Sequence, residues 1–146
     1  MAKRKQLGSM PCPIAQSLDI VGEWWSLLVI REAFYGTRRF GDFEARLGIA
    51  RNILSARLCK LTERGILRRV PSRDGSKYLE YELTEMGQEI GPILIALGRW
   101  GSKWLRGKEM TQKDALEVVR RARAARADAR PVATAGRRSK AEKNSE

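Results

Sequence analysis

The chain has 146 residues, with 29 Lys and Arg against 17 Asp and Glu, no histidine and a calculated pI of about 10.4. The lack of histidine excludes Ser-His-Asp and Cys-His nucleophile pairs, an imidazole general base and any zinc site that needs imidazole ligands. Two cysteines, Cys12 and Cys59, are too few for a four-thiolate site. We therefore expect one domain that is not an enzyme and holds no metal or cofactor. Its high pI indicates an anionic partner.

The N-terminal sequence and the lengths of the apolar runs indicate the cellular location of the protein. The first residues are basic, but polar residues follow where a signal peptide would have an apolar stretch. No apolar run approaches the roughly 18 residues of a membrane span. We expect a cytoplasmic protein of bacterial type with no membrane partner, and so few cysteines agree with a reducing compartment.

The positive charge is distributed unevenly. Residues 1–10 carry a net +3 and residues 106–146 carry +6, whereas residues 11–37 and 78–105 each sum to −2. Residues 38–77 alone carry +7, because eleven basic side chains stand against four acidic ones. A solvated surface normally mixes both signs. This block is therefore the candidate electrostatic contact with nucleic acid.

Apolar spacing predicts helices throughout the first half of the chain. Two helices before residue 36 are expected to form part of the core. A short helix over 39–47 follows, and then a helix over 50–64 with an inward stripe of Leu54, Leu58 and Leu61. Only two residues, Gly48 and Ile49, separate these helices. The pair is therefore predicted to be a helix-turn-helix.

The periodicity changes after this pair. Residues 66–70 and 77–83 alternate at period two on either side of an Asp74-Gly75 turn, which predicts a β-hairpin. In this hairpin, one face of the second strand should carry Leu79, Tyr81 and Leu83. A helix-turn-helix followed by a hairpin is the element order of a winged helix.

A long helix is predicted from Thr84, its candidate N-cap, to about Leu105. Its large apolar residues recur at alternating steps of three and four, as in a seam between packed helices. This apolar seam comprises Ile90, Ile93, Leu97, Trp100 and Trp104. The preceding elements offer little surface to cover two tryptophan rings. We expect the seam to form a homodimer interface, with packing inside one protomer as the alternative.

The expected fold is mainly α with a small β-hairpin wing: a winged helix-turn-helix with a long C-terminal dimerisation helix. Four segments are expected. They are a basic N-terminal arm (1–10), the winged helix-turn-helix domain with its dimerisation helices (11–105), a basic Ala/Arg-rich helical extension (106–130) and a disordered tail (131–146).

The candidate DNA contacts follow from projecting the helix over 50–64 with its leucines inward. The projection turns Asn52 and Ala56 outward and leaves Arg51 at the N-terminal end, the part of a recognition helix that reads the major groove. Asparagine pairs with adenine, and arginine pairs with guanine or a phosphate. The start of the preceding helix and the hairpin tip supply further phosphate contacts. The predicted DNA-binding residues are Arg38, Arg39, Arg51, Asn52, Ser55, Ala56, Lys60, Arg73 and Lys77. Arg57 is either a further contact or a structural ion pair.

Five separated motifs resemble those of the HxlR-type transcriptional regulators, which are related to the MarR type. They are Cys12-Pro13-Ile14 and the segments 22–32, 39–43, 54–58 and 81–87. The resemblance covers about residues 11–105. It implies a homodimer that binds double-stranded DNA at a palindromic operator, as a repressor rather than an activator, with half-sites about 34 Å apart or a multiple of that.

The resemblance also implies a role for one cysteine. Some members of the family sense electrophiles or oxidants through a cysteine before the first helix, and Cys12 stands in that position. A helix N-terminus stabilises a thiolate. The alternative is a small packed residue. An electrophile, an oxidant or another small-molecule effector is therefore an open part of the expected function.

An RNA-binding or ribosome-associated basic protein is the alternative function. It would require exposed aromatic rings for base stacking, whereas the tryptophans here fit apolar stripes. A membrane-surface helix over 112–129 would lack a Trp or Phe to insert. The sequence therefore favours a DNA-binding regulator.

Overall fold

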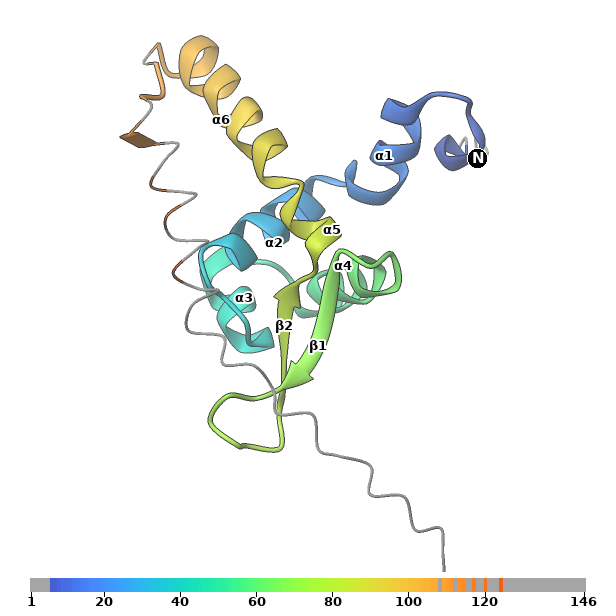
Figure 1. The fold of residues 1–146 in the computed structure, drawn as a ribbon, viewed down its shortest axis with the longest axis vertical. Helices are drawn as coiled ribbons and strands as arrows, with labels where there is room; N and C mark the ends of the chain where they lie inside the picture. The colour runs from blue at the N-terminus through green and yellow to red at the C-terminus, as the bar shows by residue number, and fades with distance from the viewer. Residues whose placement is uncertain are drawn as a thin grey trace, which may run out of the picture.

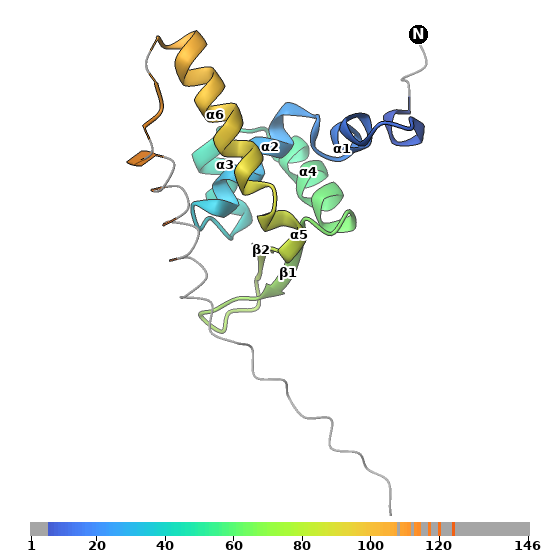
Figure 2. The ribbon, with the colours of Figure 1, turned by 45° about the horizontal axis from the view of Figure 1, so that its top comes forward.

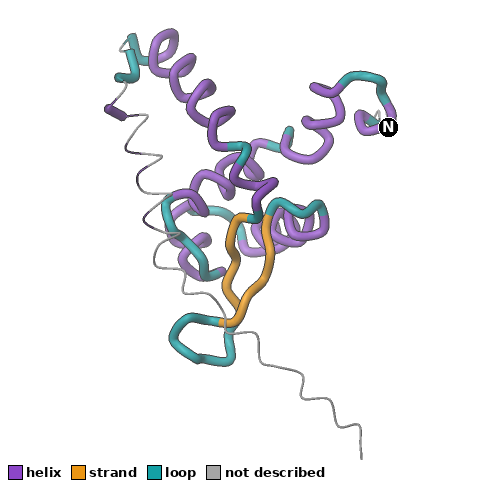
Figure 3. Tube along the Cα trace, viewed as in Figure 1, coloured by secondary structure: helices purple, strands orange, loops and turns teal. Residues whose placement is uncertain are grey.

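A computed structural model describes residues 6–107 and, beyond them, residues 109–111, 113, 114, 117, 120 and 124. Most of the predicted extension, the whole predicted tail and the first five residues of the predicted arm lie outside the described residues. The elements are η1 (Leu7–Ser9), α1 (Pro13–Val21), α2 (Trp24–Phe34), α3 (Phe40–Leu47), α4 (Arg51–Glu63), β1 (Leu67–Pro71), β2 (Leu79–Leu83), α5 (Glu85–Gln88) and α6 (Gly91–Leu105). This is the predicted mainly helical winged helix-turn-helix (Figure 3).

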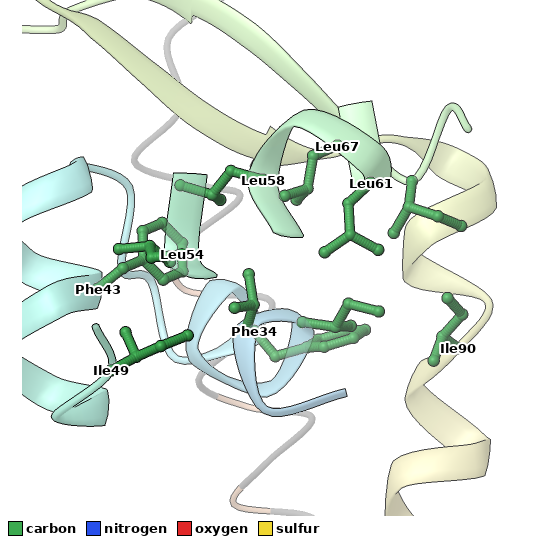
Figure 4. Packing of buried hydrophobic residues seen from close by; sticks show 11 residues of the cluster. Phe34, Phe43, Ile49, Leu54, Leu58, Leu61, Leu67 and Ile90 are labelled. Atoms are coloured by element: carbon green, nitrogen blue, oxygen red, sulfur yellow. The ribbon is translucent and has the colours of Figure 1, made fainter. Parts of the chain in front are cut away.

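Three helices and the hairpin form the body of the molecule. Helices α2, α3 and α4 pack together, and the hairpin lies against them (Figure 1). Helices α1 and α6 leave this body in diverging directions, at the end opposite the hairpin tip (Figures 1 and 2). The core draws on the helices and the hairpin alike (Figure 4). It consists of Val29, Ile30, Phe34, Phe43, Ile49, Leu54, Leu58, Leu61, Ile66, Leu67 and Ile90.

The ends of the two helix-turn-helix elements are set by local residues. Gly48 ends α3 with a φ of 61°, and Gly65 follows α4 with a φ of 76°. Both values lie in the left-handed region that glycine occupies without a steric penalty. The turn from Gly48 to Ala50 places α3 and α4 against each other, and Ile49 in the turn is buried. The predicted helix-turn-helix is therefore confirmed.

The C-terminal helical segment spans residues 85–105 but is interrupted once. Thr84 caps its start, since its Oγ1 accepts a hydrogen bond from the Gly87 amide at 3.1 Å. Helix α5 ends at Gln88, and α6 begins at Gly91. Pro92 explains the interruption, because it has no N–H to donate to the Gln88 carbonyl and its ring clashes with that carbonyl in a continuous helix. Helix α6 therefore takes its own direction.

The hairpin has the predicted antiparallel pairing, with Leu67 opposite Leu83 and Pro71 opposite Leu79. Tyr81 and Leu83 pack against the core. Leu79 does not: it is 46% exposed, whereas its neighbour Glu80 is only 5% exposed. Leu79 stays exposed because it lies at the hairpin-tip end of the paired strands, opposite Pro71, whereas Arg38 and Arg39 cover Glu80 on the other face of β2.

Among the helices within the described part of the chain, none combines the length and the apolar character needed to cross a bilayer.

Candidate nucleic-acid interface

Helix α4 presents the expected side chains to solvent. Leu54, Leu58 and Leu61 are fully buried against the other helices and the hairpin. The side opposite this stripe carries exposed residues near the N-terminal end of the helix, as the helical projection predicts. They are Arg51, Asn52, Ser55 and Ala56. Two small residues beside an amide and a guanidinium leave room for the edges of base pairs to approach.

The guanidinium of Arg51 is held at the start of α4. Its Cζ lies 4.8 Å from the centre of the Phe40 ring, and its Nη1 lies 3.2 Å from Oε2 of Glu44. The side chain is nevertheless 75% exposed. Both contacts come from α3, so the helix-turn-helix itself orients this arginine. Its two partners leave most of the guanidinium open to an incoming acceptor.

Arg38 has a different environment from the one expected of a phosphate contact. Its Nε donates to Glu80 Oε2 at 2.8 Å and its Nη2 donates to Glu82 Oε2 at 2.9 Å. Only 15% of the side chain is exposed. The backbone also joins the hairpin here, since the Arg38 carbonyl accepts a 2.8 Å hydrogen bond from the Tyr81 amide. The structure therefore commits Arg38 to holding β2 against the helices.

Arg39 connects the start of α3 to the wing tip. Its Nη2 donates to Ser72 Oγ at 2.9 Å and also to Asp74, and its Nε lies 3.5 Å from Glu80. Hydrogen bonds from Ser72 and then Arg39 hold the pKa of the Asp74 carboxyl well below its usual range. The Arg39 side chain remains partly exposed. It can therefore support the wing and still reach a phosphate.

Two further basic residues of α4 face the N-terminal half of the chain. The Lys60 ammonium donates to the Asp19 carbonyl at 2.7 Å, at the end of α1. Arg57 forms an ion pair of 3.6 Å with Glu23. Neither side chain points along the outward row of Asn52 and Ala56. Lys60 thus has an intramolecular partner on α1, and Arg57 forms the ion pair that its sequence position left open.

The wing tip keeps exposed basic residues. Arg73 and Lys77 are both exposed in the segment between the strands. The Lys77 ammonium lies 5.9 Å from the centre of the Tyr78 ring, which is also exposed. The tip is therefore a second basic surface, separate from the start of α4.

Ion pairs neutralise much of the basic block over 38–77. At least seven of its eleven basic residues pair with carboxylates. They are Arg38, Arg39, Arg46, Arg51, Arg57, Arg64 and Arg68. Most of the partner carboxylates stand outside the block in sequence, including Glu80 and Glu82 directly beyond it. The net +7 of this segment therefore overstates the charge that is open to a ligand.

Buried carboxylates make the fold sensitive to acid. Burial raises the pKa of Glu32, Glu80 and Glu82, but hydrogen bonds from arginines outweigh it, so each pKa lies below its usual range. For Glu32 the donors are Arg46 and Arg31. A carboxyl whose pKa is lower in the folded than in the unfolded state stabilises the fold above the unfolded pKa. That stability is lost as the pH falls.

We therefore expect the free energy of unfolding to be nearly constant between about pH 7 and 5.5 and to fall steadily below about pH 5. Urea titrations at pH 7, 5, 4 and 3 measure this profile. Glu32→Gln should show a shallower decline than the unchanged protein, because one of the titrating groups is removed. Equal stability at pH 7 and pH 4 would contradict the prediction.

The two cysteines lie in different surroundings. Cys12 is half-buried and directly precedes α1, where its carbonyl accepts the Gln16 amide at 3.0 Å. Cys59 is exposed on α4 with its Sγ 3.4 Å from Glu63 Oε1. The Glu63 carboxylate raises the pKa of the Cys59 thiol, which disfavours the reactive thiolate. Cys12 stands at the N-cap position of α1.

The apolar seam of α6 is largely exposed. Ile93, Leu97, Trp100 and Trp104 are each more than half exposed, whereas Ile90 is 8% exposed and belongs to the core. Ile90 therefore differs from the other four seam residues, since it precedes Pro92 and lies in the turn before α6. From here on, the exposed seam means Ile93, Leu97, Trp100 and Trp104.

A second exposed apolar surface, which the sequence pattern does not predict, lies on α1 and at the start of α2, and consists of Ile14, Leu18 and Trp24. The four-residue step from Ile14 to Leu18 is typical of a core helix, and an apolar stripe does not tell whether its cover comes from the same chain. Helices α1 and α6 are thus two arms, each with an uncovered apolar face (Figure 2).

Comparisons with known proteins agree with this geometry. A family model described as HxlR-like helix-turn-helix matches residues 20–109. Rv3095 of Mycobacterium tuberculosis, an uncharacterized HTH-type transcriptional regulator, is 44% identical over 92 residues, which are 63% of this chain and 58% of that protein. This chain therefore spans less than two thirds of that relative's length.

Two solved structures extend the comparison. That of PA1607, a proposed transcription factor, has a TM-score of 0.65 and 43% identity, and covers 68% of this chain and 70% of that one. The redox regulator HypR in its oxidized form has a TM-score of 0.55 and 30% identity, and covers 63% of this chain and 96% of that one. With its helix-turn-helix, its hairpin and a family match over 20–109, the chain belongs to the HxlR-like helix-turn-helix family of DNA-binding transcriptional regulators.

Proposed function

We propose that the chain is a homodimeric repressor that binds a palindromic operator with α4 and the wing of each protomer. The observation that supports this most directly is the position of the two uncovered apolar arms. They leave the body at the end opposite the wing tip (Figure 1). A second protomer that covers α1 and α6 leaves the basic surfaces of both protomers free for DNA. Large exposed apolar surfaces usually mark such interfaces.

In this proposal, some of the basic and polar residues contact DNA and others hold the DNA-binding elements in place. Arg51 and Asn52 read bases or position the helix at its N-terminal end, and the small Ser55 and Ala56 permit close approach. Arg39, Arg73 and Lys77 contact phosphates. Arg38 and Lys60 act through the hairpin and α1, respectively, because their polar groups are already engaged there.

Selection of bound fragments from genomic DNA, followed by footprinting, tests the proposal. Asn52→Ala should weaken binding to the selected operator by about 1–3 kcal/mol and relax the preference at one base position. Arg51→Ala should weaken binding as well. Arg106→Ala is the matched control for loss of one charge, since Arg106 is exposed beyond the end of α6.

The salt dependence gives an independent measure. If the dimer neutralises about 6–10 phosphates, the logarithm of the association constant should fall against the logarithm of salt concentration with a slope of about −5 to −9. A slope near −1, or operator binding unchanged in both Arg51→Ala and Asn52→Ala, would reject the proposed interface.

An effector that acts through Cys12 is the second part of the proposal. It is supported by the position of Cys12 at the start of a proposed dimer arm and by the likeness to HypR, which is described as a redox regulator. With a quinone, the Cys12 thiolate sulfur would form a C–S bond to a ring carbon as the ring C=C π bond opens toward the conjugated carbonyl, whose oxygen takes a proton from water. The test compares operator release by a quinone in the unchanged protein and in Cys12→Ser. Identical release dismisses Cys12.

The RNA-binding alternative gains no support from the exposed tryptophans. Trp24, Trp100 and Trp104 lie beside exposed aliphatic side chains on the arms. A stacking platform for single strands combines aromatic rings with positive charge. Helix α6 does carry Arg99 and Lys103, and the Lys103 ammonium lies 5.4 Å from the centre of the Trp104 ring. The alternating three- and four-residue spacing of the exposed seam nevertheless favours a helix as its partner.

A further inference from the structure

Helix α1 is attached to the core by apolar contacts at its C-terminal end. Ile20 and Val21 pack against the core there, whereas Ala15 is the most buried residue of the helix, and Ile14 and Leu18 are exposed. The helix projects from the body as an arm (Figures 1 and 2). Apolar packing within the protomer therefore holds the base of the arm and leaves its outer part uncovered. Polar contacts add to this packing before a partner covers the arm.

Those contacts come from one flank of α4. The Lys60 ammonium donates to the Asp19 carbonyl at 2.7 Å, and Arg64 Nη2 donates to Asp19 Oδ2 at 3.0 Å. The Lys60 contact also places a positive charge at the C-terminal end of α1, where the helix dipole is negative. Two charged donors from the last turns of α4 thus converge on one residue of the arm.

The same flank also holds the start of α2. Arg57 pairs with Glu23 at 3.6 Å, and Glu23 Oε2 in turn accepts the Trp25 amide at 3.3 Å as the N-cap of α2. Arg57, Lys60 and Arg64 are spaced three and four residues apart and therefore share one face of α4. We call Arg57, Lys60 and Arg64 the α4 clamp. These three residues contact both sides of the joint between α1 and α2, at Asp19 and at Glu23.

The joint itself is short and tight. Only Gly22 and Glu23 separate α1 from α2. A Cβ atom at Gly22 would lie 2.3 Å from the Leu18 carbonyl oxygen, so no other residue fits without a shift of the chain. The direction of the arm therefore depends on this joint, on the packing of Ile20 and Val21 directly before it, and on the clamp on either side of it.

We propose that Asp19 is a positioning residue, through which the α4 clamp locks the dimer arm α1 to the recognition helix α4. This inference rests on the proposed homodimer. If α1 forms part of the interface, the clamp makes each recognition helix rigid with respect to the dimer axis. It thereby sets the separation and angle of the two α4 helices, and so which half-site spacing the dimer accepts.

The exposed Cys59 on α4 provides a probe that needs no operator. A nitroxide label on Cys59, in a Cys12→Ser background, reports the distance between the two α4 helices of the dimer by pulsed double electron resonance. With the clamp intact, we expect one narrow distance distribution. Asp19→Asn and Arg64→Gln each break the same ion pair, and each should at least double the width of that distribution.

Asp19→Asn raises the net charge by one and Arg64→Gln lowers it by one. A general electrostatic effect would therefore change the width of the distance distribution in opposite directions in the two variants. Loss of the clamp increases the width in both. Glu109→Gln and Arg106→Gln are exposed, charge-matched controls and should keep the narrow distribution. Circular dichroism verifies that each variant is folded. An unchanged width in either clamp variant, or opposite changes in the two, would overturn the clamp. No dipolar signal with the clamp intact would instead reject the homodimer.

Discussion

Trp100→Lys is expected to convert the dimer to monomers. Trp100 lies in the middle of the exposed seam, and burying such a ring at an interface typically contributes about 2–4 kcal/mol. A twofold interface contains each residue twice, and the substitution also places two uncompensated charges in the apolar contact. The dimer dissociation constant should rise by at least about 30-fold, since 1.4 kcal/mol is about tenfold.

Sedimentation equilibrium over a range of protein concentrations measures this constant. Operator affinity should fall in parallel, because a monomer engages one half-site. Met86→Lys is the matched control: Met86 is an exposed apolar residue of α5 and lies outside the exposed seam. A Trp100→Lys protein that dimerises as strongly as Met86→Lys would exclude α6 as the interface.

Glu80→Gln is expected to lower the free energy of unfolding by about 3 kcal/mol. Removing one member of a buried ion pair leaves the other charge without compensation, which costs about 3–5 kcal/mol. The lower end applies here because Arg38 keeps its hydrogen bond to Glu82. The hydrogen bonds of Ser72 and Arg39 to Glu80 are weakened at the same time.

Denaturant unfolding at pH 7 measures the loss, and Glu44→Gln is its control. Glu44 also pairs with an arginine, Arg51, but the pair is exposed, and exposed pairs contribute about 0–1 kcal/mol. The same chemical change should thus have unequal effects at the two positions. Equal losses in the two variants would show that burial of the Glu80 cluster contributes nothing to the stability of the wing.

Local patterns were sufficient to predict the fold. Helix spacing, the glycine at the end of α3 and the Asp-Gly turn each depend on residues close in sequence, and the elements follow them. The same holds for the outward row of α4, because three buried leucines fix the rotation of the helix. The break before α6 is also predictable from the sequence, since Pro92 has no amide hydrogen to donate to a helical hydrogen bond.

The roles of individual arginines were not readable in the same way. Arg38 pairs with Glu80 and Glu82, more than forty residues away, and Lys60 reaches the Asp19 carbonyl at a similar separation. No periodicity connects such positions. Ile90 illustrates a different limit, because a three-four repeat continues across a helix break without showing that the chain has changed direction.

The internal ion pairs give the chain a way to discriminate among the polyanions of a cell. An arginine that already holds a carboxylate gains little from a flexible polyanion, because one favourable contact replaces another. At least seven of the eleven basic residues in 38–77 are in this state. A rigid duplex that fits α4 and the wing together would replace the partners of both Arg39 and Arg51, the two paired arginines proposed to contact DNA. The net +7 of residues 38–77 is thus compatible with weak binding to unstructured RNA and strong binding to one DNA shape.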